Sequence, residues 1–351
     1  MPRVVGIDAG TVSLDVCGLV DGRLSLDLTW PTPEAIADPD GFIAGLSAAG
    51  APDLVAAPSG YGLAARDART VTEEELRLAF LAGPDERGGI GGLRRLARRL
   101  AASELPVVFT PGVMHLDTVP AHRKVNRVDL GTADKVCATA LAVEDHRRRT
   151  GKRVEDVSLI LLELGGAFTA AVAVDRGQIV DGIGGTSGPI GWRSAGALDG
   201  EVAFLAGTVD KALLFSGGAE TVAQSGPRAR ALAIAAYVEG AVKAVAQLRT
   251  SAPEADEVLV SGRGAADTGL LERLHAALSG VAAVRRLEGF ALVAKQGAQG
   301  AALLADGLAG GRHEALVERL RIREAQGTVL DHLYVITPAA ARRRLGLDSD
   351  G

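Results

Sequence analysis

The first arrangement in this sequence that could do chemistry is an acid closely followed by a glycine. Asp8 ends an apolar run and is followed by Gly10 and Thr11, with Ser13 two positions further on. Gly10 lets the backbone approach phosphate oxygens, and Thr11 and Ser13 offer hydroxyl groups. Asp8 can hold Mg²⁺ or one of its waters. The stretch predicts a hairpin, with two interpretations: a phosphate-binding turn, or a buried hairpin that has the same pattern for shape alone.

The same arrangement returns 155 positions later, after a second apolar run. The equivalent positions are Asp8 and Glu163, Gly10 and Gly165, and Gly22 and Gly177. Because chance would have to produce both spacings together, the match predicts a duplicated domain. In the second copy Glu163 is the expected metal ligand, and Gly165 and Gly166 are the expected phosphate-binding glycines.

Residues 114–135 form the densest polar stretch of the chain and show neither helical nor strand periodicity. Loops with this much polarity usually carry function, and a purely structural loop is the alternative. The candidates are His122, Arg123 and Asp134 for catalysis, and Lys124 and Arg127 for substrate binding. The cations would neutralise charge on a transferring phosphoryl group. Asp134 would act as acid or base towards a hydroxyl acceptor, or would offset the dipole at a helix N-terminus.

Two small-residue turns in the second half complete the candidate site. A flexible polar loop over 182–189 contains Ser187, a candidate substrate contact, and precedes Arg193. A predicted buried strand then runs into the turn Ser261-Gly262-Arg263. A flat base or a ribose could lie against the backbone of such a turn, so we assign it to nucleotide binding.

Composition limits the class of protein. The chain has 351 residues, enough for two domains, and 47% of them are apolar although only 3% are aromatic. A net charge of −5 leaves no electrostatic footprint for nucleic acid. Two cysteines without a C-x-x-C motif indicate a reducing compartment. With no signal-peptide pattern and no apolar run of membrane-spanning length, the sequence predicts a cytoplasmic protein that needs no membrane.

The elements that position these residues follow from periodicity. We expect strands on both sides of each acid-x-Gly turn, a helix over 72–81 that begins with a Thr72-x-x-Glu75 capping pattern, and a long amphipathic helix over 228–249. Small residues over 294–302 predict a helix that packs closely. The predicted boundaries are 1–152 for the first lobe, 153–311 for the second, and 312–351 for a helical tail.

The order of these parts resembles the superfamily of acetate and sugar kinases, Hsp70 and actin. The two hairpins resemble its two phosphate loops, 260–264 resembles its adenosine motif, and 295–301 resembles the helix that links its lobes. The resemblance covers about residues 3–310 and implies an α/β fold of two ribonuclease-H-like, actin-like ATPase lobes. It also implies ATP and Mg²⁺ as cofactors, bound in a cleft between the lobes.

A closer resemblance is to a family labelled predicted butyrate kinase. The motifs that carry it are Val119-Pro120-Ala121-His122-Arg123-Lys124-Val125-Asn126-Arg127, Gly131-Thr132-Ala133-Asp134-Lys135, Gly185-Thr186-Ser187-Gly188-Pro189 and Ala325-x-Gly327-Thr328-Val329-Leu330-Asp331-His332. The label is an inference from fold and leaves the substrate open.

Acetate and butyrate kinases offer a further comparison. Arg193, with Gly196 and Asp199 after it, resembles the stretch that supplies their catalytic arginine. The segment 131–135 resembles their His-Gly-Thr-Ser-His-Lys segment, and this places Leu130 where their catalytic histidine stands. Leu130 cannot stabilise a phosphoryl group. Phosphorylation of a carboxylate then requires His122 or Arg127 to reach the same space.

The sequence therefore predicts an ATP-dependent phosphotransferase that acts on a small molecule, with a short-chain carboxylate ahead of an alcohol as acceptor. One alternative is an actin-like ATPase switch, in which hydrolysis moves the lobes to control a partner. Another is a nucleotide-binding protein without turnover. The partners expected are the small-molecule acceptor, no nucleic acid and no membrane, and homodimerisation is left open.

Overall fold

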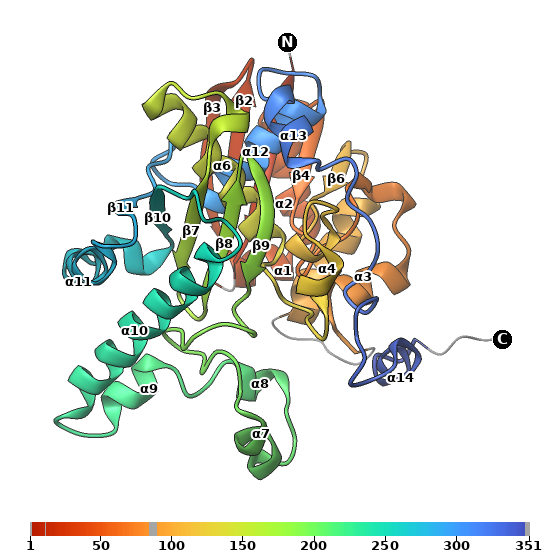
Figure 1. Ribbon diagram of the computed structural model, residues 1–351. Coiled ribbons are helices and arrows are strands. Elements are labelled where there is room, and N and C mark those ends of the chain that lie inside the picture. The colour runs from red at the N-terminus through yellow and green to blue at the C-terminus, as the bar shows by residue number, and fades with distance from the viewer. Residues whose placement is uncertain (1, 11, 84–89, 348–351) are drawn as a thin grey trace. The chain divides into compact units, whose positions relative to one another are not determined.

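The computed structural model describes residues 2–10, 12–83 and 90–347, so the predicted role of Thr11 lies outside the described residues (Figure 1). The chain divides into two compact units. The first consists of Met1–Val128, Thr132–Val154 and Gly289–Gly351, and the second of Asp129–Gly131 and Glu155–Glu288. The predicted boundaries placed residues 289–311 in the second lobe and 312–351 in a separate tail. In the structure both segments group with the first unit.

The first unit contains a six-stranded sheet in the order β3-β2-β1-β4-β6-β5. Its strands are β1 (Arg3–Ala9), β2 (Ser13–Val20), β3 (Arg23–Pro31), β4 (Leu54–Ala57), β5 (Arg66–Asp67) and β6 (Val107–Phe109). The first three form an antiparallel meander, and β4 and β6 continue the sheet parallel to β1. Asp8 therefore lies at the carboxyl end of β1, where sheets with parallel strands place ligands.

The second unit repeats this plan in a five-stranded sheet, in the order β11-β10-β7-β8-β9. Its strands are β7 (Leu159–Leu164), β8 (Thr169–Asp175), β9 (Gln178–Ile183), β10 (Glu257–Ser261) and β11 (Ala283–Arg286). Again three strands form an antiparallel meander and two more run parallel to its first strand. The sheet order agrees with the predicted duplication.

The offset of 155 positions holds in the detail of the two meanders. The N–H of Gly10 donates to the carbonyl of Ser13 at 3.0 Å, and that of Gly165 donates to Phe168 at 2.9 Å. The register of each second strand shifts at equivalent places, between Gly18 and Leu19 and between Ala173 and Val174. Each meander then turns through two residues with positive φ, Asp21-Gly22 in one and Arg176-Gly177 in the other.

Helix α12 (Gln296–Leu308) is the buried centre of the first unit and packs against β1, β2 and α6 (Ala133–Thr150). Glycines allow this close approach. A Cβ on Gly6 would lie 2.1 Å from the nitrogen of Ala302, and one on Gly300 would lie 1.7 Å from the carbonyl oxygen of Cys137. The close packing expected of this helix is confirmed, and it explains why residues 289–311 belong to the first unit.

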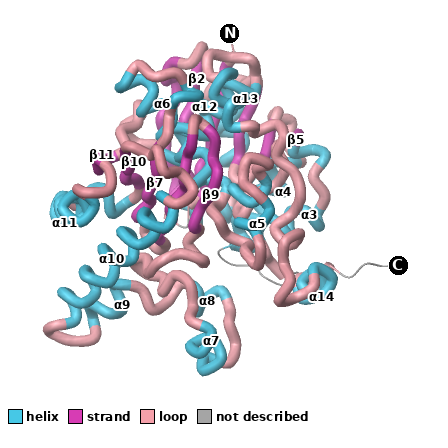
Figure 2. Tube along the Cα trace, viewed as in Figure 1, coloured by secondary structure: helices cyan, strands magenta, loops and turns pink. Residues whose placement is uncertain are grey.

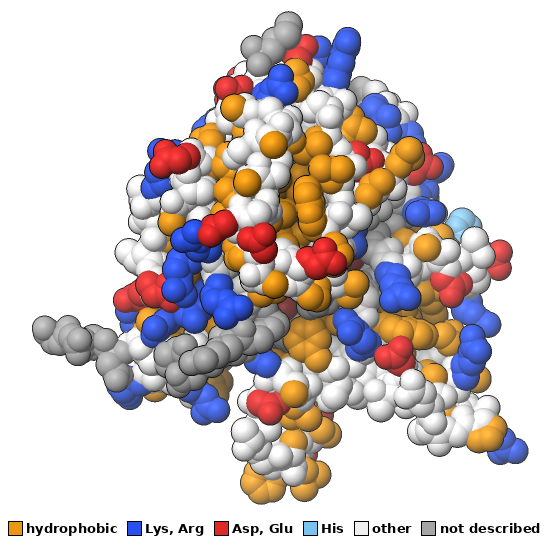
Figure 3. Space-filling model, turned by 180° about the vertical axis from the view of Figure 1, so that it is seen from behind, with side chains coloured by type: hydrophobic (Ala, Val, Ile, Leu, Met, Phe, Trp, Pro, Cys, Tyr) orange, Lys and Arg blue, Asp and Glu red, His pale blue; other side chains and the backbone are white. Residues whose placement is uncertain are grey.

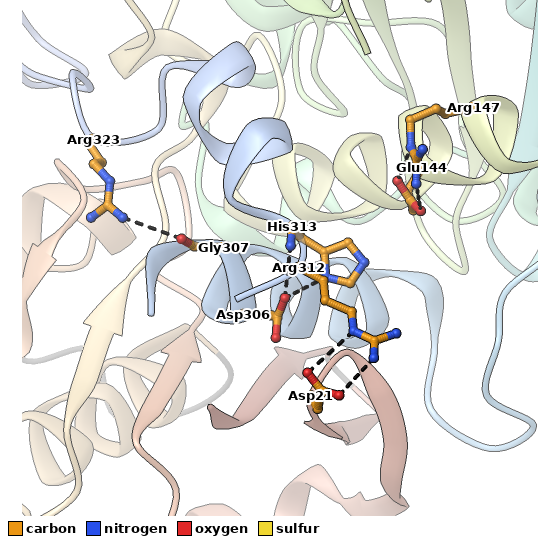
Figure 4. Close-up of polar contacts among 8 residues, drawn as sticks. All are labelled: Asp21, Glu144, Arg147, Asp306, Gly307, Arg312, His313 and Arg323. Atoms are coloured by element: carbon orange, nitrogen blue, oxygen red, sulfur yellow. Dashed lines mark hydrogen bonds and ion pairs between the residues drawn. The ribbon is translucent and has the colours of Figure 1, made fainter. Parts of the chain in front are cut away.

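The C-terminal end of α12 is anchored by polar contacts (Figure 4). The buried carboxylate of Asp306 accepts from the backbone N–H of His313 at 3.0 Å and lies 2.7 Å from its Nδ1. The guanidinium of Arg312 pairs with Asp21 in the turn after β2, at 2.8 Å. These contacts fix the start of the tail to the first meander.

The remaining helices of the first unit lie outside this centre. They are α1 (Thr32–Ala37), α2 (Pro39–Ala48), α3 (Glu73–Phe80), α4 (Ile90–Ala101), α5 (Ala121–Lys124), α13 (Glu314–Leu320) and α14 (Pro338–Arg344). The capping box predicted for 72–81 is present, with Thr72 and Glu75 each accepting from the other's backbone N–H.

In the second unit, α10 (Ala229–Arg249) packs one face on β7 and β8, and α11 (Thr268–Leu278) packs beside β11. By length and composition α10 could also cross a membrane, and within its most apolar window 33% of the residues are buried. The segment with α7 (Gly200–Ala206) and α8 (Lys211–Leu214) projects beyond β7–β9, before α9 (Ala219–Gln224) (Figure 2). Phe204 and Leu205 in α7 are exposed. The space-filling view shows apolar side chains exposed on this face of the molecule (Figure 3).

Candidate functional site

The turn between β1 and β2 places the Asp8 carboxylate against the N-terminus of α12. Asp8 is only 9% exposed. A Cβ on Gly297, in the first turn of α12, would lie 2.6 Å from Asp8 Oδ2, so glycine is required for this approach. The positive end of the helix dipole therefore meets the end of β1, which favours negative groups there. This geometry fits the predicted phosphate turn.

Ser13 and Asp15 form a hydrogen-bonded polar pair on the second strand of the hairpin. The Ser13 hydroxyl donates to Asp15 Oδ2 at 2.9 Å, and Asp15 is 2% exposed. Lys295, the residue before α12, donates from Nζ to Ser13 Oγ at 2.5 Å and pairs with Asp15 at 2.9 Å. Sequence reasoning missed Lys295 and Asp15. The signal was an acid in the middle of an otherwise apolar strand, because such an acid needs a buried partner.

Asp134 lies in the first turn of α6, as its helix-terminal alternative predicts. Its carboxylate accepts from the Thr132 hydroxyl at 2.5 Å and from Lys135 Nζ at 2.5 Å. Burial acts to raise the pKa of Asp134, but the charge and hydrogen bond of Lys135 outweigh it, with a smaller contribution from Thr132, and hold the pKa below its ordinary value. Asp134 is therefore ionised at neutral pH. Burial raises the pKa of the Cys137 thiol, and the negative charges of Asp134 and Asp8 raise it further.

The polar stretch before α6 is held by its own side chains and by the tail. Lys124, a predicted substrate contact, is 8% exposed, and its ammonium donates to the Leu116 carbonyl at 2.8 Å, so its contact with substrate stays a prediction. Burial lowers its pKa. His122 and Arg127 are exposed, and Arg123 is half-buried.

Asn126 ties the same stretch to the tail. It adopts a left-handed conformation with φ of 52°. Its side-chain oxygen accepts the backbone N–H groups of Tyr334 and Val335 at 2.7 and 3.0 Å, and its own N–H donates to the His332 carbonyl at 2.8 Å. The tail therefore helps to fix the predicted substrate loop within the first unit.

The second unit builds its turn from Gly165, Gly166 and Arg193. The Arg193 Nε donates to the Gly166 carbonyl at 3.0 Å, and its backbone N–H donates to Ala167 at 3.1 Å. A Cβ on Gly166 would meet no atom within 4 Å, so the turn is open at this point. The structure thus brings the predicted catalytic arginine directly to the predicted second phosphate turn.

The predicted adenosine turn packs against the same hairpin. Ser261 pairs with Glu163 in the β10–β7 register. Gly262 has φ of 80°, and a Cβ there would lie 2.6 Å from the Leu164 carbonyl oxygen. Ser261 Oγ is buried and has no hydrogen-bond partner among the described residues, whereas Arg263 is exposed. Glu163 and Ser261 therefore lie side by side at the carboxyl ends of two neighbouring parallel strands, and Gly262 follows directly after Ser261.

Asp129 begins the short segment Asp129–Gly131, which belongs to the second unit and is called the crossover segment below. It connects this segment to the loop that carries Ser187. Its Oδ2 accepts from the backbone and the hydroxyl of Thr186, and its Oδ1 accepts from the Gly131 N–H at 3.1 Å. The Ser187 hydroxyl donates to the Asp129 carbonyl at 2.5 Å. Ser187 therefore positions its loop, and in this arrangement its hydroxyl could contact substrate only as an acceptor. Leu130 lies in this crossover segment, in the second unit.

These residues fit Mg²⁺ bound together with a polyphosphate. Mg²⁺ in such sites usually needs one or two carboxylates, because waters and phosphates supply the other ligands. Within the described residues no group of three or more His, Cys, Asp or Glu side chains could hold a metal by itself. In the first unit Asp8, beside a glycine that leaves it room, is the predicted carboxylate ligand, and in the second unit Glu163 stands at the equivalent strand end.

Solved structures with similar folds show the fold class of this chain. An acetate kinase from Entamoeba histolytica matches at 13% identity and a TM-score of 0.57, covering 80% of this chain and 87% of that one. A propionate kinase from Francisella tularensis matches at 12% identity and a TM-score of 0.58, covering 86% and 99%. An acetate kinase from Porphyromonas gingivalis matches at 14% and 0.54, covering 78% and 86%. The chain thus has the actin-like ATPase fold of these kinases, which confirms the predicted fold class.

Within this class the chain belongs to the family described as "Protein of unknown function (DUF1464)", whose model matches residues 6–335. No curated protein matches the chain. The closer resemblance to predicted butyrate kinases is not confirmed by this family assignment.

Proposed function

We propose that this chain is an ATP-dependent phosphotransferase that transfers a phosphoryl group to a short-chain carboxylate in the cytoplasm. The observation that carries the proposal is the equivalence of the two hairpins, each with an acid at the end of its first strand and the same turn hydrogen bond and register shift at an offset of 155 positions. The fold that the chain shares with acetate and propionate kinases supports the reaction class.

Phosphoryl transfer depends on positioning and charge neutralisation more than on covalent chemistry by the protein. Asp8 and Glu163 would hold Mg²⁺, which neutralises the phosphates, and the backbone of Gly10, Gly165 and Gly166 would contact them. Arg193, held at the Gly166 carbonyl, would stabilise charge on the transferring group. Ser261 and Gly262 would face the nucleoside.

The state of Asp134 favours a carboxylate acceptor over an alcohol. A carboxylate is ionised at neutral pH and needs no base, whereas a hydroxyl must lose a proton. Asp134 is committed to Thr132 and Lys135, and its lowered pKa makes it a weak base. Leu130 stands where acetate and butyrate kinases have their catalytic histidine, and its side chain cannot stabilise a phosphoryl group. Other side chains must then serve the acceptor carboxylate, and His122, Arg123 and Arg127 are those that would bind it.

The test measures ADP release from MgATP with acetate, propionate and butyrate, and with a panel of sugars and alcohols. We expect a short-chain carboxylate to stimulate turnover, and Asp8→Asn and Arg193→Ala each to lower it about 100-fold or more. Glu239→Gln is the matched control, because Glu239 is exposed on α10 and pairs with Lys243 in a surface contact. Turnover that ignores every acceptor but rises with a partner protein would instead identify an ATPase switch.

A further inference from the structure

The first phosphate turn has a lysine beside it that belongs to no part of the duplicated motif. We propose that Lys295 is a phosphate-binding residue, whose ammonium contacts the phosphate chain of the nucleotide at the turn between β1 and β2. This inference rests on the proposed function and adds to it a residue that neither the duplicated motif nor the family match assigns.

Comparison of the two hairpins separates ligand binding from folding. At the offset of 155 positions, Ser13 corresponds to Phe168 and Asp15 to Ala170. Both hairpins nevertheless keep the same turn hydrogen bond and the same register shift. The fold of the hairpin therefore does not require a serine and an acid at these positions. The polar pair and the lysine bound to it are specific to the first copy.

The position of Lys295 suits a phosphate contact. Its Nζ lies 3.4 Å from the point where a Cβ on Gly10 would stand, so a larger residue in the turn would crowd it. An ammonium has three N–H donors. Among the described residues, Ser13 and Asp15 take two of them, and the side chain is 48% exposed. One donor thus remains for an anionic oxygen that approaches the turn from solvent.

The backbone before α12 holds Lys295 in place in advance. The Asp27 carboxylate on β3 accepts the N–H groups of Leu292, Val293 and Ala294 at 2.7–3.2 Å. The Gln299 side chain accepts from Phe290 at 2.7 Å and donates to the Ala294 carbonyl at 2.7 Å. A cation fixed before its ligand arrives loses less conformational entropy on binding.

A simpler role is conceivable for Lys295, namely to neutralise the buried carboxylate of Asp15. The two roles differ in a double variant. If the lysine serves Asp15 alone, Lys295→Gln harms the protein by leaving a buried charge unpaired, and adding Asp15→Asn repairs it. If the lysine binds phosphate, Asp15→Asn cannot restore phosphate affinity in the double variant.

The experiment measures binding of magnesium tripolyphosphate, MgATP and adenosine to the full chain by titration calorimetry. For Lys295→Gln we expect affinity for tripolyphosphate and ATP to fall about 10- to 100-fold, with adenosine unchanged. Lys295→Arg keeps the charge and should lose less. Lys243→Gln is the matched control, because Lys243 is an exposed lysine on α10. Thermal unfolding of each variant reports whether it is folded.

The inference is overturned if Lys295→Gln binds both phosphate probes within about twofold of wild type, or if Asp15→Asn restores the affinity of the double variant. Either result leaves the proposed function standing, provided the wild type binds MgATP and turns it over with a carboxylate. A wild-type chain that binds neither MgATP nor tripolyphosphate contradicts the proposed function itself, and the inference falls with it.

Discussion

The Asp129 carboxylate accepts hydrogen bonds from both the backbone N–H and the hydroxyl of Thr186, at 3.0 and 2.9 Å, across 57 residues of sequence. The Asp129 carbonyl also accepts from Ser187 and from Gly184. A Cβ on Gly184 would lie 1.8 Å from Asp129 Oδ1, so the contact needs glycine. Two motifs that the sequence presents separately are thus one polar cluster in the second unit.

Asp129→Ala should therefore destabilise the protein. It removes the acceptor for three donors around a buried side chain, and unsatisfied buried donors typically cost about 1–3 kcal/mol. Chemical denaturation would measure the change in the free energy of unfolding. Thr186→Ser keeps the hydroxyl and is the control, with little change expected. Equal stability of Asp129→Ala and wild type would show that the cluster contributes nothing.

Removal of the Asn126 side chain should loosen the tail. Asn126→Ala loses the oxygen that accepts from Tyr334 and Val335, whereas Asn126→Asp keeps an acceptor there. We expect limited proteolysis to cut within residues 328–347 several times faster in the alanine variant than in the aspartate variant. Identical cleavage rates in the two variants would contradict the anchoring role of Asn126.

The packing of α12 on α6 predicts that Gly300→Ala is destabilising. Its Cβ would overlap the Cys137 carbonyl, and overpacking of this kind typically costs about 1–3 kcal/mol. Gly280→Ala is the control, because a Cβ there meets no atom within 4 Å. Thermal unfolding of both variants tests the prediction. A Gly300→Ala variant that melts with wild type would mean that the helices can separate without cost.

The Asp306–His313 contact predicts a pH dependence of stability. Burial acts to raise the pKa of Asp306, but hydrogen bonds from the His313 side chain and backbone, with its charge, outweigh burial and lower the pKa below 3.8. A carboxyl whose pKa is lowered by folding stabilises the protein above its unfolded pKa, and this contribution is lost as pH falls through the folded value.

Asp306→Asn should consequently be less stable than wild type near pH 7, and the difference in unfolding free energy should shrink below about pH 4. Denaturation of both proteins at a series of pH values between about 2 and 7 measures it. Asp267→Asn serves as the control, because Asp267 caps the exposed start of α11 and asparagine caps a helix about as well. A stability difference between Asp306→Asn and wild type that stays constant across this range would contradict the prediction.

The sequence was sufficient to predict what depends on local spacing. The acid-x-Gly turns, the closing turns with glycine and the capping box of α3 follow from residues close together in the chain. The duplication follows from the repeat of this local spacing 155 positions later, and the structure contains each of these features. The fold class followed from the order of these parts. The burial of Lys124 could not be predicted in this way, because burial of a lysine is decided by what packs over it.

The composition and spacing of residues by themselves determined two copies of one meander, each with an acid at the end of its first strand. Only the tertiary structure decided which side chains surround each acid. Ser13 and Lys295 are 282 residues apart, and they meet because glycines let α12 dock on β1 and β2. Local propensity cannot specify such a contact, because it depends on the backbone separation of elements distant in sequence. This separation placed a lysine beside the first turn.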